Sequence, residues 1–191
     1  MKESASRNGR LARLALLPAL PLLCALLLLS PGRGPSVTTA AEPAFQTPRP
    51  WTAVGSSGVV DEASRDFYAF DGAGITFNDN TAGNVIVARY NVTNTFDNYS
   101  AGPTIPGWKY LEVGSSVPPR HTGKAVLYKI ANCATAPEPI CTVTLSDQTP
   151  CGRCLIGSAV DFSTALFYVE VTLTRPAGSP ARPRVDTLRI Y

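Results

Sequence analysis

Four cysteines in the second half of the chain are the residues whose type and spacing most directly suggest chemistry: Cys133, Cys141, Cys151 and Cys154. The Cys151-Gly152-Arg153-Cys154 spacing matches a CxxC redox centre, but that chemistry needs its first cysteine at the start of a helix. Pro150 and the strand-like residues around it do not fit such a start. A structural zinc site usually takes two closely spaced pairs, and Cys133 and Cys141 lie too far apart to form the second. The spacing therefore favours disulfides over redox catalysis or zinc.

The fifth cysteine of the chain, Cys24, lies in a predicted export leader, and the even number that remains after its removal predicts two disulfides, for which three pairings are possible. Cys133 follows a predicted strand at 124–130, and Cys141 opens another at 140–145. If these strands form a hairpin, the two cysteines face each other across its mouth. We therefore expect a Cys133–Cys141 bridge, and by elimination a Cys151–Cys154 bridge.

Acidic residues gather early in the domain, where they suggest either a calcium site or a pair of catalytic carboxylates. They are Asp61, Glu62, Asp66, Asp71 and Asp79, with Asn78 and Asn80 nearby. Their oxygen atoms are suitable calcium ligands, but EF-hand spacing is missing. Adjacent side chains such as those of Asp61 and Glu62 point in opposite directions on a strand, which makes them a weak glycosidase pair. We expect solvated loop acids and no cofactor, with calcium as the weaker alternative.

His121 is the histidine that a Ser-His-Asp hydrolase would have to use, because the chain contains one histidine. It lies in the loop-like segment 118–123, between two prolines and a glycine. No Gly-x-Ser-x-Gly elbow accompanies it. The sequence favours a solvated loop histidine over a general base, which needs a partner in hydrogen-bonding reach.

Aromatic residues provide the hint of a binding surface. Trp108 and Tyr110 are two residues apart in a predicted strand and are expected to share a face, with Tyr99 in the preceding polar loop. Two rings on a sheet face can stack against a sugar. The same spacing also occurs in core or rim packing, and the large area that these rings bury favours packing.

Alternation of apolar and polar residues indicates the strands that must position these side chains. It is clearest at 166–174, where Phe167, Val169, Val171 and Leu173 alternate with polar residues or tyrosine. Segment 84–92 repeats the pattern with Ile86, Ala88, Tyr90 and Val92 on one side. Shorter strands are predicted at 67–70, 74–77, 108–113, 124–130, 140–145 and 185–190, separated by turn residues.

About eight strands without a convincing helical segment predict an all-β domain. An antiparallel two-sheet β-sandwich, jelly-roll-like, is the natural way to bury eight half-apolar strands. The sequence does not indicate the strand order.

The first 41 residues are predicted to be a signal peptide. A basic leader precedes the 16-residue apolar run 14–29. This run is shorter than a membrane-spanning helix usually is, and it contains two prolines, which disfavour such a helix. Small residues that a signal peptidase can accept follow near Ala40 and Ala41. Residues 42–50 form a predicted Pro-rich linker, and 51–191 the single β domain. We expect cleavage, although an uncleaved anchor stays an alternative.

The formal net charge of +3 comes from this leader. It holds five of the 17 basic residues and one of the 14 acids, so residues 42–191 carry 12 basic and 13 acidic residues. Their charge gives no reason to expect nucleic acid or, after cleavage, a membrane as partner.

The sequence thus favours a secreted or surface-associated, non-enzymatic domain, extracellular or periplasmic, that acts by binding or as structure. The sequence does not identify its partner; a glycan and another surface protein are the two candidates. A carbohydrate-binding module is the first alternative, which exposed Trp108 and Tyr110 rings would favour. An extracellular hydrolase is the second, which a cleft holding Asp61 or Glu62 opposite another carboxylate would favour.

Overall fold

A computed structural model of the protein describes residues 49–80, 82–95, 105–158 and 160–191. The expected signal peptide 1–41, residues 42–48 of the expected linker and Tyr99 lie outside these ranges. Across the described ranges, no helix is long and apolar enough to span a membrane.

The described residues form eleven strands and two short 3-10 turns. They are β1 (Trp51–Val54), η1 (Gly55–Ser57), β2 (Val59–Val60), η2 (Glu62–Ser64), β3 (Tyr68–Asp71), β4 (Gly74–Phe77), β5 (Val85–Val92), β6 (Tyr110–Ser116), β7 (Thr122–Ala131), β8 (Glu138–Leu145), β9 (Cys151–Leu155), β10 (Ala165–Thr174) and β11 (Arg184–Ile190). Each of the eight predicted segments overlaps a strand, which confirms the all-β prediction. The sequence does not predict β1, β2 and β9, because these short strands lack a clear apolar alternation.

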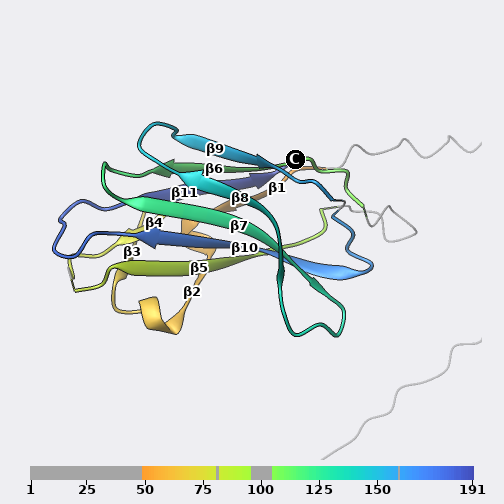
Figure 1. Cartoon of the computed structure of the whole chain (residues 1–191), viewed down its shortest axis with the longest axis horizontal. Coiled ribbons are helices and arrows are strands. Elements are labelled where there is room, and N and C mark those ends of the chain that lie inside the picture. Colours follow the sequence, from red (N-terminus) through yellow and green to blue (C-terminus); the bar gives the residue numbers. More distant parts are fainter. Residues whose placement is uncertain (1–48, 81, 96–104, 159) are drawn as a thin grey trace, which may run out of the picture. The chain divides into compact units, whose positions relative to one another are not determined.

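The strands form two antiparallel sheets, as expected (Figure 1). Sheet A has the order β3-β4-β11-β6-β9, with β1 also paired to β11, and sheet B has the order β2-β5-β10-β7-β8. Within these sheets, the eight strands β4 to β11 form two facing four-stranded layers, with the orders β4-β11-β6-β9 in sheet A and β5-β10-β7-β8 in sheet B. Successive strands change sheet except at the β7–β8 hairpin. This is the strand order of a jelly roll, built from two interleaved Greek keys.

The core lies between the sheets, where every second residue of each strand is buried. On β10 the inward residues are Phe167, Val169, Val171 and Leu173, at most 4% exposed. Burial of the predicted apolar face of β5 is also confirmed, since Ile86, Ala88, Tyr90 and Val92 are at most 5% exposed. The central strands β10 and β11 come last in the chain, so the core is completed only when its C-terminal strands pair with earlier ones.

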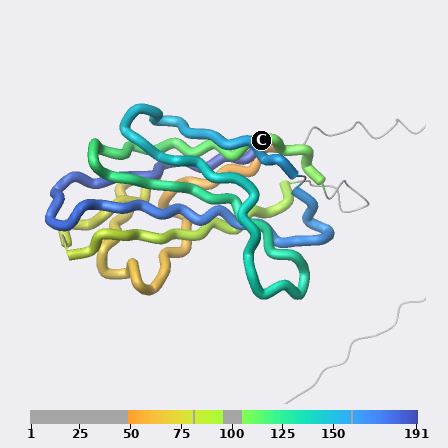
Figure 2. The backbone as a smooth tube through the Cα atoms, in the orientation of Figure 1, coloured from red at the N-terminus to blue at the C-terminus, as the bar shows by residue number. Residues whose placement is uncertain are grey.

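The two edges of the sandwich are closed differently. At one edge the chain passes from β1 in sheet A through η1 to β2 in sheet B, and through η2 back to β3 in sheet A. This crossover is the orange-to-yellow segment of Figure 2. At the other edge, β8 of sheet B and β9 of sheet A are joined by a disulfide between Cys141 and Cys154, with Cα atoms 5.9 Å apart.

The structure corrects the predicted disulfide pairing. The β7–β8 hairpin forms, but its register sets Cys141 opposite Leu127, whereas Cys133 lies in the loop beyond the end of β7. Cys151 and Cys154 are three residues apart on one strand, about 10 Å at the usual rise, which exceeds the reach of a disulfide. Their side chains also project to opposite faces of β9. Cys133 and Cys151 are exposed free thiols.

Candidate functional site: a tyrosine face on sheet B

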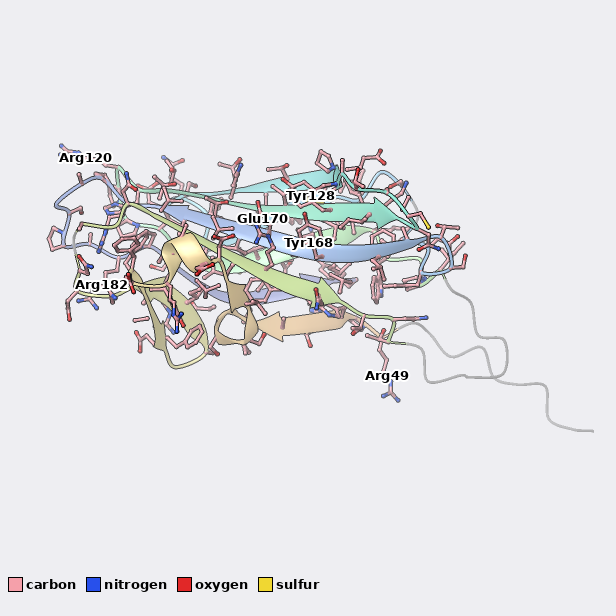
Figure 3. All side chains as sticks on the ribbon, turned by 90° about the horizontal axis from the view of Figure 1, so that it is seen from below. Arg49, Arg120, Tyr128, Tyr168, Glu170 and Arg182 are labelled. Atoms are coloured by element: carbon pink, nitrogen blue, oxygen red, sulfur yellow. A yellow bond between two sulfur atoms is a disulfide. The ribbon has the colours of Figure 1, made fainter. Side chains whose placement is uncertain are left out.

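The outer face of sheet B carries a cluster of aromatic and charged side chains. Because Phe167 and Val169 of β10 point into the core, Tyr168 and Glu170 must point outward. On β7 the outward residue opposite Tyr168 is Tyr128, and on β5 the residue opposite Glu170 is Arg89. Figure 3 shows Tyr128, Tyr168 and Glu170 together near the middle of this sheet.

Tyr128 and Tyr168 stack on each other. Their ring centroids are 5.1 Å apart and their planes differ by 19°. This centroid distance is larger than the separation of two rings stacked directly face to face, so the rings are offset. Aromatic pairs prefer an offset stack over direct face-to-face stacking. The stack leaves the opposite face of each ring free of the partner ring. Both tyrosines are half-buried, so they contribute accessible aromatic surface.

A chain of ion pairs fixes the charged side chains beside the tyrosines. Arg89 donates from Nε to Glu170 Oε2 at 2.9 Å and from Nη1 to Asp61 Oδ2 at 3.0 Å. Asp61 itself is held by η2, since its Oδ1 accepts from the Ala63 amide at 3.1 Å. A guanidinium has five N–H donors, so two bonds leave Arg89 with further donors on a side chain that is 46% exposed. We call Tyr128, Tyr168, Glu170, Arg89 and Asp61 the tyrosine face.

Several groups of the tyrosine face have perturbed proton affinity. The Ala63 amide and then the Arg89 guanidinium hold the pKa of Asp61 below its usual range. Hydrogen bonding to Asp61 outweighs burial and, with the Glu170 contacts, raises the pKa of Arg89. Burial, with the Glu170 charge, raises the pKa of Tyr168. A cluster of groups with shifted pKa values, here Asp61, Arg89 and Tyr168, marks a candidate functional site.

A hollow of about 800 Å³ adjoins the tyrosine face at the crossover edge. Trp51, Val54 and Val59 form part of its apolar wall, and Arg89 and Asn91 line its side toward sheet B. Asn91 also lies opposite Tyr168 in the β5–β10 ladder. Because Arg89 belongs to both, the face and the hollow form one continuous surface of the size that small ligands occupy.

The structure separates the two rings that were expected to form a platform. Trp108 precedes β6 and is 5% exposed, with its ring edge-to-face against Phe162 at 5.9 Å and its Nε1 donating to the Arg49 carbonyl at 3.1 Å. Tyr110, the first residue of β6, lies on the outer face of sheet A beside Tyr191. The strand begins too late to set both side chains on one face. Trp108 is therefore a core residue, as the packing interpretation has it.

The early acids do not converge. Asp61 pairs with Arg89, Asp71 with Arg184 and Asp79 with Arg182, so three carboxylates go to three different arginines. Glu62 begins η2, and Asp66 uses its backbone carbonyl to accept from Asn78. Among the described residues, no three His, Cys, Asp or Glu side chains lie close enough together to hold a metal ion.

Sequence reasoning missed the tyrosine pair because 40 positions separate its members. The alternation along β10 places Tyr168 outward, but no local pattern says which residue lies opposite it. Only the β7–β10 register, with Tyr168 facing Tyr128, brings the rings together. The signal available in the sequence was the pair of outward tyrosines on two long strands.

No protein-family model matches the chain, and no curated protein is similar to it at a significant level. The functional argument therefore rests on the geometry of the tyrosine face.

Proposed function

We propose that the domain is a carbohydrate-binding module of an exported or surface-associated protein, and that the tyrosine face holds the sugar chain without hydrolysing it. The observation that carries this proposal is the half-exposed Tyr128–Tyr168 pair beside the ion-paired Arg89 and Glu170. Glu170 is two residues after Tyr168 on β10, so all four side chains share the outer face of sheet B.

The chemistry of a sugar matches this arrangement. The C–H faces of a pyranose ring pack on aromatic rings, and each sugar hydroxyl both donates and accepts hydrogen bonds. Arg89 supplies donors and Glu170 supplies acceptor oxygens side by side, which suits two neighbouring hydroxyls. Because the ion pairs already hold both side chains, ligand binding costs little additional side-chain entropy.

The charges of the tyrosine face support binding over glycoside hydrolysis. A glycosidase needs one carboxyl group that stays protonated to act as the acid. Arg89 instead bridges both carboxylates, and the lowered pKa of Asp61 opposes its protonation, so Asp61 is poorly suited to act as that acid. The adjoining hollow gives room for further sugar units beyond the tyrosines.

The test is a screen of the purified protein on an oligosaccharide array of glucans, mannans, galactans, xylans and chitin oligomers, followed by titration of the best ligand. We expect Tyr168→Ala to weaken binding about tenfold or more, because it removes one stacking surface. Arg89→Met should weaken it as well, because charged hydrogen-bond donors are lost.

Tyr110→Ala is the matched control, because Tyr110 is a half-buried tyrosine on the other sheet. It should bind like the wild type. A blank array, or binding lost in Tyr110→Ala but kept in Tyr168→Ala, would overturn the proposal.

A further inference from the structure

Two loops at one end of the sandwich bring a serine and the histidine together. Residues 117–121 join β6 to β7 and residues 175–183 join β10 to β11, at the left of Figures 1 and 2. Ser179 Oγ lies 3.1 Å from His121 Nε2, although 58 positions separate the residues. His121 is only 9% exposed, so the expectation of a solvated loop histidine is wrong.

The other ring nitrogen of His121 sets the direction of this hydrogen bond. Nδ1 lies 3.0 Å from the Pro119 carbonyl oxygen, which can only accept, so Nδ1 carries the proton. In the neutral imidazole, this tautomer presents the Nε2 lone pair to Ser179, whose hydroxyl then donates. A base oriented by a third group and bonded to a hydroxyl is the arrangement that activates a nucleophile. Here the Pro119 carbonyl takes the orienting position that a carboxylate has in Ser-His-Asp triads.

The serine hydroxyl is itself held in place. The Ala181 amide donates to Ser179 Oγ at 3.3 Å, while the hydroxyl proton goes to His121. A hydroxyl oxygen has two lone pairs, so one remains for attack on an electrophile.

A hollow of about 420 Å³ borders this pair. Its walls come from both loops and include Pro118, Pro176, Ala177 and Arg120. Arg120 has φ of 69°, a left-handed conformation that costs a non-glycine residue about 1–2 kcal/mol. Such strain is concentrated at functional sites. Figure 3 shows Arg120 at this end of the molecule, where it brings positive charge to the rim.

We propose that Ser179 and His121 form a nucleophile–base pair that hydrolyses carboxylic esters with small acyl groups. Ser179 Oγ bonds the ester carbonyl carbon as its proton passes to His121 Nε2, and Arg120, at the rim of the hollow, supplies positive charge that favours the developing oxyanion. The bond from carbonyl carbon to alkoxy oxygen then breaks, and the proton leaves with the alcohol. Water attacks the acyl-serine and gives a proton to His121, which returns it to Ser179 as the carboxylic acid departs. The activity does not depend on sugar binding, because the pair lies in loops outside the tyrosine face.

The experiment treats the purified protein with a fluorophosphonate probe, locates the label by mass spectrometry and measures p-nitrophenyl acetate hydrolysis. We expect the label on Ser179 and a hydrolysis rate that falls at least about 100-fold in both Ser179→Ala and His121→Gln, since each removes half of the pair. Thermal unfolding of each variant verifies that it is folded.

Ser163→Ala is the matched control, because Ser163 is an exposed serine whose Oγ donates to the Asp161 carboxylate at 2.7 Å, not to an imidazole. It should keep the wild-type rate. Absence of label from Ser179, equal labelling of Ser163, or a hydrolysis rate unchanged in Ser179→Ala would each refute the proposal. Labelling of Ser179 in the wild-type protein tests the proposal even if His121→Gln does not fold.

Discussion

Arg175 illustrates how one buried side chain organises a loop of this domain. It is 1% exposed, its guanidinium carbon lies 4.3 Å from the centre of the Phe77 ring, and its N–H groups donate to the carbonyls of Asn78, Asn80 and Gly83. Burial, together with the Arg182 charge, lowers the pKa of Arg175. Among the described residues, carbonyl oxygens and an aromatic ring contact the guanidinium, and no carboxylate pairs with it. These contacts hold the described part of the β4–β5 loop around the buried cation.

We expect Arg175→Met to lower the free energy of unfolding by about 3 kcal/mol, because it leaves buried carbonyls without donors. Arg182→Met is the control, since it removes an arginine from a solvent-exposed ion pair with Asp79 and should cost about 0.5 kcal/mol. Urea unfolding of both variants measures the difference. Equal losses would show that the loop does not depend on the guanidinium.

Among the elements, β8 and β9 show how strand register decides covalent structure. A bulge at Ile140 shifts the β7–β8 register between the pairs Leu127↔Cys141 and Tyr128↔Pro139. Cys141 lies on the regular side of this bulge, opposite the buried Leu127, so it shares the inward face of Val143; Cys154 faces inward from β9. The disulfide therefore joins the edge strands of the two sheets instead of closing a hairpin.

Peptide mapping without reduction should recover Cys141 linked to Cys154, and alkylation of the unreduced protein should label Cys133 and Cys151. The bridge spans a sequence separation of 13, so replacing both bridged cysteines with alanine should cost about 3 kcal/mol through the larger entropy of the unfolded chain. Cys133→Ala should change stability by no more than about 0.5 kcal/mol, because this side chain is exposed. A recovered Cys133–Cys141 peptide would contradict the structure.

At the scale of the whole β domain, closure of the crossover edge depends on Tyr90 of β5. Its hydroxyl donates to the Gly55 carbonyl in η1 at 2.7 Å. Gly58 packs so closely that a Cβ there would lie 2.5 Å from the Tyr90 ring. Tyr90 thus ties sheet B to the segment that crosses over from sheet A, and burial raises the pKa of its phenol.

This burial predicts a loss of stability at alkaline pH. An unfolded tyrosine loses its proton near pH 10, whereas folded Tyr90 keeps it to higher pH, so the folded state binds more protons above pH 10. The free energy of unfolding should therefore fall above pH 10, by up to about 1.4 kcal/mol per pH unit from this group. Tyr90→Phe should lose about 1 kcal/mol at pH 7 but decline less steeply above pH 10.

Urea unfolding between pH 7 and pH 11 measures this difference. Tyr110→Phe is the control and should decline like the wild type, because it removes a tyrosine hydroxyl from the outer face of sheet A and leaves Tyr90 in place. If Tyr90→Phe declines as steeply as the wild type, a group other than Tyr90 causes the alkaline loss.

The sequence by itself determined the all-β class and most of the strands. Apolar side chains at alternate positions of β5 and β10 give each strand one face that must be buried. This pattern can be read from neighbouring residues of a single strand. Placement of Tyr168 and Glu170 on the outer face follows from the same alternation. The three strands that the sequence does not predict are short and obtain their stability from pairing with β11, β5 and β6.

Only the tertiary structure decided which distant residues meet. Register between β7 and β10 joined Tyr128 to Tyr168, loop packing joined His121 to Ser179, and the approach of two sheet edges joined Cys141 to Cys154. Each contact links residues on different strands or loops, and its formation depends on strand order and register. These follow from the packing of the whole core, so a local pattern cannot specify them.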